Sequence, residues 1–484
     1  MLFNSLEFIF CFLPITVVVF FLLQRFAAPM VSRGWLLVAS LFFYSWWNIA
    51  YLPLILGSIV ANYVLSIAIC RTKPQRAKKS IFVLGLSLNL LLLGTFKYLD
   101  FFIANTNGVF GTAIPLQEII LPLGISFFTL QQIAFLVDAY EGLVEEHSFV
   151  NYGVFVSFFP QLIAGPIVHH AEMMPQFEER SPFKSQHLVQ GMVLFIIGFS
   201  KKILLADTFG DWAHNVFDGG APLMLEAWTG MYCYAFQLYF DFSGYVDMAM
   251  GAALMLNIRL PLNFNSPYRA LTIIEFWQRW HITLTNFITT YLYTPMLRAA
   301  KKVTFPKAML ATLTAMTIAG LWHGANWTYV IFGVLHGLAL VVNNVRQKRK
   351  SRKLPVGLAW FLTFHFVALT LLIFRSENLA ALANVIDGLR GRFGLMLPGV
   401  LEGKLSFITH PGVFYGDALG RMGGYFWTPF CLIAALIVVF RFRPSHQIVD
   451  DFQPRAWNAV WYGLLFMLCV FKLSEPSEFL YFQF

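Results

Sequence analysis

Residues 356–374, VGLAWFLTFHFVALTLLIF, decide the fold class of this chain, because nineteen residues pass without one charged side chain. About 20 residues of this kind cross a bilayer as a helix. Comparable stretches recur along the sequence, so we expect a polytopic, all-α integral membrane protein. The predicted spans are 6–24, 34–52, 54–70, 81–99, 118–140, 149–168, 188–206, 227–256, 308–321, 326–344, 356–374, 427–441 and 457–473.

The overall composition supports the same conclusion. Of the 484 residues, 58% are apolar, 17% are aromatic and only 12% are charged. A soluble globular chain carries about 25% charged residues. With a mean hydropathy of +0.65, the surface must face lipid, and membrane lipid is the first predicted partner.

Several predicted spans are short or polar, so we expect eleven to thirteen membrane segments. The region 257–300 mixes prolines with charged and aromatic residues, which predicts re-entrant or interfacial segments buried in protein. We expect one membrane domain over 1–484. It divides into N-terminal helices (1–117), a catalytic core (118–345) and C-terminal helices (346–484) with a polar connection near 375–425.

The net charge of +9 does not indicate a nucleic-acid partner, because the basic residues cluster in short loops between apolar runs. Two such loops, at 71–79 and 346–353, are predicted to be cytoplasmic by the positive-inside rule. Residues 1–23 lack a basic start and a cleavage motif, which predicts a retained first helix with its N-terminus outside. The five cysteines form no CxxC pair, and we expect neither a disulfide framework nor a metal site.

Ionisable side chains at membrane depth are costly and are functional candidates by default. The first cluster is YFDFSGYVD (239–247), which holds Asp241 and Asp247 in an apolar and aromatic run. Buried carboxylates need partners. They could orient a catalytic base or an arginine, or they could form a structural polar knot that joins helices.

The second cluster is EFWQRWH (275–281). On a continuous helix Trp277 and His281 would share one face, and Glu275 and Arg279 would share another and neutralise each other. His281 would then lie over an aromatic platform. It is either a chemical group or a structurally satisfied histidine.

The third cluster is GLWHGANW (320–327), which interrupts two apolar runs. Gly320 and Gly324 flank His323, so that backbone or substrate can approach the imidazole closely. Asn326 offers amide groups one turn away. A neutral imidazole costs less than a charge in this setting and suits general-base chemistry.

Acyl transfer requires a base for a hydroxyl or thiol, a held acyl thioester and a donor for the oxyanion. The histidines, the Asn326 amide and indoles such as that of Trp322 provide these groups. His281 and His323 lack metal-binding spacing, and no nucleophile elbow or Walker motif is present. His336, on the following helix, is predicted to make an interhelical hydrogen bond.

At these residues the sequence resembles the membrane-bound O-acyltransferase (MBOAT) family, in the bacterial branch of the alginate O-acetyltransferase membrane subunit. The matching segments span nearly the whole chain. They are MLFNS (1–5) with Phe8 and FLP (12–14), LPLGISFFTLQQIAFLVDAYEG (121–142), FPQLIAGPI (159–167), QLYFDFSGYVDMAMG (237–251), LNFNSPY (262–268), EFWQRWHITLT (275–285), GLWHGANWTYVIFGVLHGLAL (320–340), LIFRSENLAAL (372–382) and FLYFQF (479–484).

The resemblance implies a funnel or tunnel of helices around paired histidines, with His323 as the catalytic histidine and His281 held near it. It implies a cytoplasmic donor, acetyl-CoA or another acyl thioester, with no bound cofactor. It also implies a polysaccharide acceptor (alginate-, cellulose- or peptidoglycan-type), a periplasmic esterase-like partner and a place in the bacterial inner membrane. Asp241, Asp247, Glu275, Trp277, Arg279, Trp322 and Asn326 are predicted to bind substrate or to support the histidines.

The sequence departs from the family branch at three places in the re-entrant region. Gln278-Arg279 stands for a usual arginine pair, Thr289-Thr290 for an arginine-aspartate pair, and Leu297-Arg298 for a glycine pair. The histidines are intact, so the acceptor, alginate included, stays open. Transfer of a D-alanyl or longer acyl group, in place of acetyl, belongs to the same class of enzyme reaction. A transporter or flippase, or a structural subunit of an export complex, is the alternative from another class.

Overall fold

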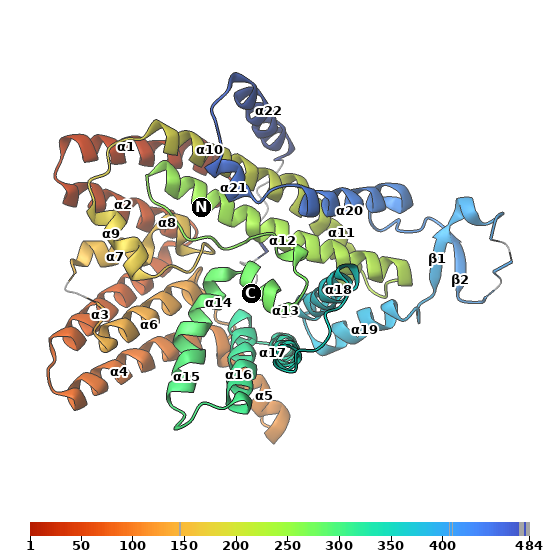
Figure 1. Cartoon of the computed structure of the whole chain (residues 1–484), viewed down its shortest axis with the longest axis horizontal. Coiled ribbons are helices and arrows are strands. Elements are labelled where there is room, and N and C mark those ends of the chain that lie inside the picture. Colours follow the sequence, from red (N-terminus) through yellow and green to blue (C-terminus); the bar gives the residue numbers. More distant parts are fainter. Residues whose placement is uncertain (145–146, 406, 409, 474–478, 481–484) are drawn as a thin grey trace.

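The architecture consists of long apolar helices (Figure 1). The computed structural model describes residues 1–144, 147–405, 407–408, 410–473 and 479–480. The helices of the N-terminal third are α1 (Leu13–Phe26), α2 (Pro29–Ser45), α3 (Leu52–Arg71), α4 (Gln75–Leu93), α5 (Leu99–Phe110) and α6 (Ile125–Glu141). Those of the middle are α7 (Phe149–Ser157), α8 (Phe159–Leu162), α9 (His170–Glu178), α10 (Ser185–Ser200), α11 (Asp207–Phe217), α12 (Met224–Met255), α13 (Ile273–Arg279), α14 (Ile282–Ile288), α15 (Thr294–Arg298), α16 (Phe305–His323) and α17 (Trp327–Lys348). The last are α18 (Val356–Arg375), α19 (Leu379–Leu389), α20 (Gly424–Arg441), α21 (Ser445–Asp450) and α22 (Ala456–Lys472).

The predicted polytopic helical membrane fold is confirmed. Seven helical stretches in the described part of the chain are by themselves long and apolar enough to cross a membrane. They are Phe8–Phe26, Ile49–Arg71, Gln75–Phe110, Ser185–Phe217, Trp327–Lys348, Val356–Arg375 and Gly424–Arg441. The other predicted segments correspond to helices that are shorter, interrupted or more polar, such as α2, α12 and α16.

Helix α12 forms the centre of the molecule, and most of its 32 residues are buried. It packs against α10 along a seam of glycines. A Cβ atom on Gly251 would lie 2.6 Å from the Gly191 carbonyl oxygen, and one on Gly198 would lie 2.5 Å from the Gly244 carbonyl oxygen. Small residues of this kind let membrane helices approach to backbone contact, so the two helices form one rigid pair.

Two predicted spans have the wrong helix boundaries. The span 118–140 begins only at Ile125, because Pro122 and Gly124 (φ +71°) prevent an earlier helical start. The span 149–168 is divided into α7 and α8 and then loses helical structure. A Cβ atom on Gly165 would lie 2.4 Å from Cα of Gln161, so the chain turns sharply at that glycine.

The placement of region 257–300 in re-entrant or interfacial segments stays a prediction. This region contains α13, whose seven residues are too few to cross a bilayer, and a helical stretch in which the π turn Thr289–Tyr293 joins α14 to α15. Side chains of α13 and α14 are buried, including Trp277 and Leu284, whereas no side chain of α15 is buried. One element was not predicted. The polar connection 375–425 contains α19 and a two-stranded parallel sheet of β1 (Leu395–Pro398) and β2 (Val413–Gly416), which projects beyond the helices at one end of the molecule (Figure 1).

Four π turns interrupt the helices in the described residues: Phe8–Phe12, Gly94–Tyr98, Lys201–Ala206 and Thr289–Tyr293. A π turn is rare and often marks a functional position. Two of these turns carry lysines inside apolar helices, Lys97 in one and the pair Lys201 and Lys202 in the other.

Candidate active site

His323 is the last residue of α16 and is only 8% exposed. The chain then turns back into α17 through Gly324. A Cβ atom on Gly320 would lie 2.3 Å from the Tyr329 carbonyl oxygen, and one on Gly324 would lie 2.1 Å from the Tyr329 ring. The predicted close approach at both glycines is therefore made by α17, which holds His323 against the neighbouring helix.

Lys97 fixes the end of α16. Its ammonium group donates hydrogen bonds to the carbonyl oxygens of Trp322 (2.7 Å) and His323 (2.9 Å) and to the Ser126 hydroxyl (3.2 Å). The last carbonyl groups of a helix lack partners within it, and a cation is favoured at that end by the helix dipole. Beside it, the Tyr98 hydroxyl donates to the Leu321 carbonyl oxygen at 2.9 Å. The backbone that carries His323 is thus bound from a helix more than two hundred residues away in the sequence.

His281 does not share a helical face with Trp277, as the sequence suggested. Helix α13 ends at Arg279, Trp280 is extended, and His281 has a left-handed backbone with φ +43°. A non-glycine residue in this region is uncommon and often belongs to a functional site. The aromatic neighbour of its ring is Phe242 of α12, in an edge contact with centroids 4.9 Å apart.

Asn263 sets the tautomer of His281. The Asn263 side-chain oxygen accepts hydrogen bonds from the backbone N–H of Thr283 (3.2 Å) and the Thr283 hydroxyl (2.9 Å), and it lies 3.1 Å from Nδ1 of His281. An atom that accepts from a backbone N–H is the amide oxygen, not the nitrogen. Nδ1 must therefore carry the proton, and Nε2 keeps the lone pair.

Both histidines are buried, His281 at 1% and His323 at 8% exposure. The His281 side is closed by Phe242, and Phe374 of α18 contacts the His323 ring edge-on at 5.3 Å. Each of the two histidines predicted from separate sequence clusters is thus buried against an aromatic side chain.

A cavity of about 330 Å³ adjoins the residues that follow His323. Its lining includes Lys97, Asp100, Asn326 and Tyr329. The helical stretch Gln75–Phe110 begins at the basic loop 71–79 and runs 36 residues. At 1.5 Å per residue, its later part, which borders this cavity, lies toward the opposite face of the membrane domain.

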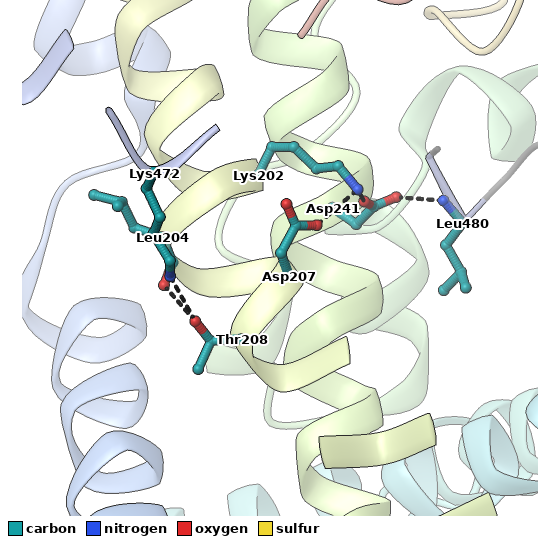
Figure 2. A network of polar contacts seen from close by, with 7 residues as sticks. All are labelled: Lys202, Leu204, Asp207, Thr208, Asp241, Lys472 and Leu480. Atoms are coloured by element: carbon teal, nitrogen blue, oxygen red, sulfur yellow. Dashed lines mark hydrogen bonds and ion pairs between the residues drawn. The ribbon is translucent and has the colours of Figure 1, made fainter. Parts of the chain in front are cut away.

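The carboxylates of the first cluster are partnered by lysines, not by the expected arginine or histidines. Asp241 lies 2.7 Å from Lys202 and accepts the Leu480 backbone N–H at 2.9 Å (Figure 2). Asp247 accepts from Lys201 and from the Ser445 hydroxyl, both at 2.6 Å. These contacts match the alternative of a polar knot that joins helices. Of the terminal FLYFQF motif, only residues 479–480 are among those that the structure describes.

Lys202 also lies 2.9 Å from Asp207, at the start of α11. Figure 2 shows how the ammonium group of Lys202 reaches between Asp207 and Asp241, while Lys472 of α22 bonds to Thr208 nearby. Two carboxylates thus surround one buried cation, and the network connects α11, α12 and the segment at Leu480.

The remaining predicted residues have clear structural contacts. The Glu275–Arg279 ion pair is present at 2.8 Å, with both side chains about one-third exposed. The Trp277 indole donates to His336 at 3.1 Å. His336 also lies 2.9 Å from the Thr370 hydroxyl of α18, which confirms its predicted interhelical bond.

Two residues of the third cluster frame His323. The Trp322 ring packs edge-on against Phe127 of α6 with centroids 5.6 Å apart, and the Lys97 ammonium lies 5.8 Å from its centroid. The Asn326 side chain caps α17 by accepting the Thr328 backbone N–H at 3.2 Å, and it also donates to the Glu377 carbonyl oxygen.

One group in the described residues could hold a metal ion: Asp138, His169 and His170, whose ligand atoms lie within 4.8 Å of one another. However, Nδ1 of His169 accepts the Ala171 backbone N–H at 3.3 Å, which assigns the proton of the neutral ring to Nε2, the atom facing Asp138. The carboxylate also accepts from the Tyr291 hydroxyl at 2.9 Å and raises the pKa of His169. A hydrogen-bonded cluster explains these contacts without a metal.

Lys97 and Asn263 were missed by sequence reasoning. Lys97 is the single charged residue in the predicted span 81–99, so the rule that intramembrane charges are functional candidates would have found it. Asn263 is one of two asparagines in the LNFNSPY segment. Nothing in the linear sequence shows that it lies beside His281.

Known proteins resemble this chain over most of its length. Residues 10–353 match the model of the membrane-bound O-acyltransferase family. The chain is 44% identical to a peptidoglycan O-acetyltransferase of Helicobacter pylori, covering 100% of this chain and 98% of that protein. It is 37% identical to the probable alginate O-acetylase AlgI of Pseudomonas aeruginosa (78% and 73% covered) and 28% identical to a teichoic acid D-alanyltransferase of Streptococcus thermophilus (53% and 69%).

These matches show that the chain is an enzyme. The alternative predictions, a transporter or a structural subunit, therefore lose their support. The family match includes both histidines, and the full-length relative extends it across the helices beyond residue 353. The chain belongs to the membrane-bound O-acyltransferase family and is a multi-pass membrane acyltransferase.

Proposed function

We propose that this chain moves acetyl groups from a cytoplasmic thioester, acetyl-CoA, across the membrane for the O-acetylation of an extracytoplasmic polysaccharide, and that peptidoglycan is the first polymer to test. The relative named peptidoglycan O-acetyltransferase aligns over the full length of this chain at 44% identity. Alginate is the second candidate, because the relatives named alginate O-acetylase are 37% identical over about four-fifths of it.

The observation that carries this proposal is the burial of His323 and His281 in the membrane domain. Both imidazoles are buried, each lies next to an aromatic wall, and each is bound in place through different elements of the fold. A water-poor site with a neutral imidazole suits a general base that acts on a hydroxyl group.

In the proposed reaction, His323 removes the proton from the acceptor hydroxyl as its oxygen attacks the thioester carbonyl carbon. The C–S bond then breaks, and the proton passes from His323 to the departing thiolate, so that the histidine is regenerated. Because Nδ1 of His281 donates to Asn263, its Nε2 is an acceptor and is suited to orient the acceptor hydroxyl. No bound cofactor is needed.

The distribution of basic residues supports the proposed direction of transfer. The basic loops 71–79 and 346–353 assign one face to the cytoplasm of a bacterial inner membrane, and the donor enters from that face. The cavity beside Gly324 and Asn326 lies toward the opposite face and suits entry of the acceptor. A periplasmic esterase-like protein is the partner that would complete transfer to the polymer.

Ester-linked acetate on purified peptidoglycan tests the proposal. A deletion strain is complemented with wild-type protein, His323→Ala, His281→Gln or the control His365→Gln, at equal membrane levels. His365 is a half-buried histidine of α18 that bonds to Tyr232, away from the site. We expect acetate with wild type and the control, and a loss of about a thousandfold with His323→Ala.

The other outcomes are equally decisive. Full acetylation by His323→Ala would reject the histidine mechanism. If wild type restores acetate to a different polymer, the chemistry stands and the acceptor is wrong. If it restores no acetate to any polymer, the acetyl donor is wrong.

A further inference from the structure

A large apolar cavity lies between α1 and α10, with Phe466 of α22 at its border, and its lining includes neither His281 nor His323. Its volume is about 1170 Å³, which exceeds the range of about 300–1,000 Å³ for drug-sized ligands. Helices α1 and α10 belong to membrane-spanning stretches, so the cavity opens toward lipid. Apolar side chains on its wall are left exposed, including Phe10, Val18 and Leu22, at 55%, 57% and 51%.

One end of this cavity is positively charged. Of the residues that the structure describes, Arg25 and Arg180 are the only charged ones in its lining. Arg180 is fixed in place, because its Nε donates to the Gln24 carbonyl oxygen (3.0 Å) and one terminal nitrogen donates to that of Ala27 (3.1 Å). In the part of the chain that the structure describes, neither arginine forms an ion pair with a carboxylate. This end therefore carries two uncompensated cations.

A buried acceptor stands beside the arginines. Gln24 lines the cavity and is 7% exposed, and its side-chain oxygen has no hydrogen-bond partner among the described residues. A buried oxygen without a donor is costly. An occupant that brings both an anion and a hydrogen-bond donor would satisfy Gln24 and the two arginines together.

From these features we propose that the cavity is a binding site for one glycerophospholipid. The phosphate lies at Arg25 and Arg180, a headgroup hydroxyl or ammonium donates to Gln24, and the acyl chains fill the apolar part toward Phe466. The charged end faces the same side as the basic loops, because α1, α2 and α3 alternate in direction and α3 ends at Arg71. Basic pockets between helices on that side suit lipid headgroups.

The lipid that co-purifies with the protein tests this site. We would purify wild type, Arg25→Gln, Val18→Trp and the control Lys73→Gln in detergent, wash away loose lipid, and count the retained phospholipid by native mass spectrometry and lipid extraction. Val18→Trp adds bulk at an exposed position of the cavity, so the core is undisturbed. Lys73 is an exposed cation of the basic loop outside the cavity.

We expect one phospholipid per chain in wild type and Lys73→Gln, and an occupancy about tenfold lower in both cavity variants. Adding palmitoyl-oleoyl phosphatidylglycerol to delipidated wild-type protein should raise its melting temperature. The same addition should raise that of either cavity variant much less.

Three results would overturn the proposal. Wild type could retain no stoichiometric phospholipid after washing. Arg25→Gln could keep the lipid while Val18→Trp loses it, which would leave an apolar groove without headgroup recognition. Site-specific cross-linking from Val18 could capture a transmembrane helix of a second copy, which would make the cavity a protein interface.

Discussion

Two regions of this molecule bury lysines inside apolar helices, and they treat the charge in different ways. Lys201 and Lys202 are matched by carboxylates, with Asp247 on one and Asp207 and Asp241 on the other. Lys97 bonds instead to two backbone carbonyl oxygens and a hydroxyl. One region neutralises its cations, while the other applies a cation to the helix end that carries His323.

The two regions retain a costly charge in the membrane for two different reasons. The lysine–aspartate network joins α11, α12, α21 and the segment at Leu480, which is an architectural role. Lys97 holds the backbone of the proposed general base, so we infer that it is a positioning residue. The following changes test that distinction, from the largest expected effect to the smallest.

Lys202→Met should destabilise the fold most. It leaves Asp241 buried beside Asp207 without a cation, and breaking a buried pair in this way costs about 3–5 kcal/mol. We expect a large fall in the unfolding midpoint in detergent and low membrane levels.

The double variant Lys202→Met/Asp241→Leu removes both charges and should recover much of this loss. Equal instability of the single and double variants would show that the ion pair itself is not what joins the helices.

Lys97→Met should affect turnover more than folding. Two carbonyl groups beside His323 lose their donor, at a cost of about 1–3 kcal/mol each if they stay dry, and the imidazole loses its fixed backbone. We expect kcat to fall by about a hundredfold, with a much smaller change in the unfolding midpoint than for Lys202→Met and with partial rescue by Lys97→Arg. A stability loss as large as that of Lys202→Met would erase the distinction between the two regions.

Asn263→Ala tests whether His281, the second histidine, is also held in position by a neighbouring residue. Without the amide oxygen, Nδ1 of His281 loses the acceptor that selects its tautomer. If the lost hydrogen bond raises the activation free energy by about 2 kcal/mol, kcat falls roughly thirtyfold. The matched change Asn265→Ala alters the other asparagine of the same segment and should be milder. If the two variants have equal activity, the tautomer argument fails.

Glu275→Gln should have the smallest effect. The Glu275–Arg279 pair is one-third exposed, and such pairs contribute less than about 1 kcal/mol. Activity and the unfolding midpoint should stay near the wild-type values, although this pair also lies in the re-entrant region. A loss of more than tenfold would place Glu275 or Arg279 in substrate binding.

Much of the fold could be predicted from the sequence, because a long apolar run in a membrane has few alternatives to a helix. The helices around 356–374 and 326–344 were placed within a few residues. The failures lie where one residue decides the backbone. Gly124 delays the start of one predicted helix and contacts Leu162, which is distant in the sequence, while Gly165 bends the chain back onto Gln161. Neither effect can be seen in the hydropathy of the sequence.

The site was partly predictable for a related reason. His323 was conspicuous as a polar residue between glycines, and it lies in a buried site. The position of His281 was predicted from helical spacing, but the chain leaves the helix at Trp280 and adopts φ +43° at His281. That conformation depends on Asn263 and Thr283, which only the tertiary structure brings together.

The π turns have a consequence for how such sites arise. A π turn adds one residue to a helix, and that residue rotates everything after it by about 100° around the axis. Removing one residue from Gly94–Tyr98 would leave an unbroken helix, yet it would turn Lys97 or the residues beyond it away from their present neighbours. One inserted or deleted residue can therefore change the direction in which the side chains of a helix point, while the helix itself stays in place.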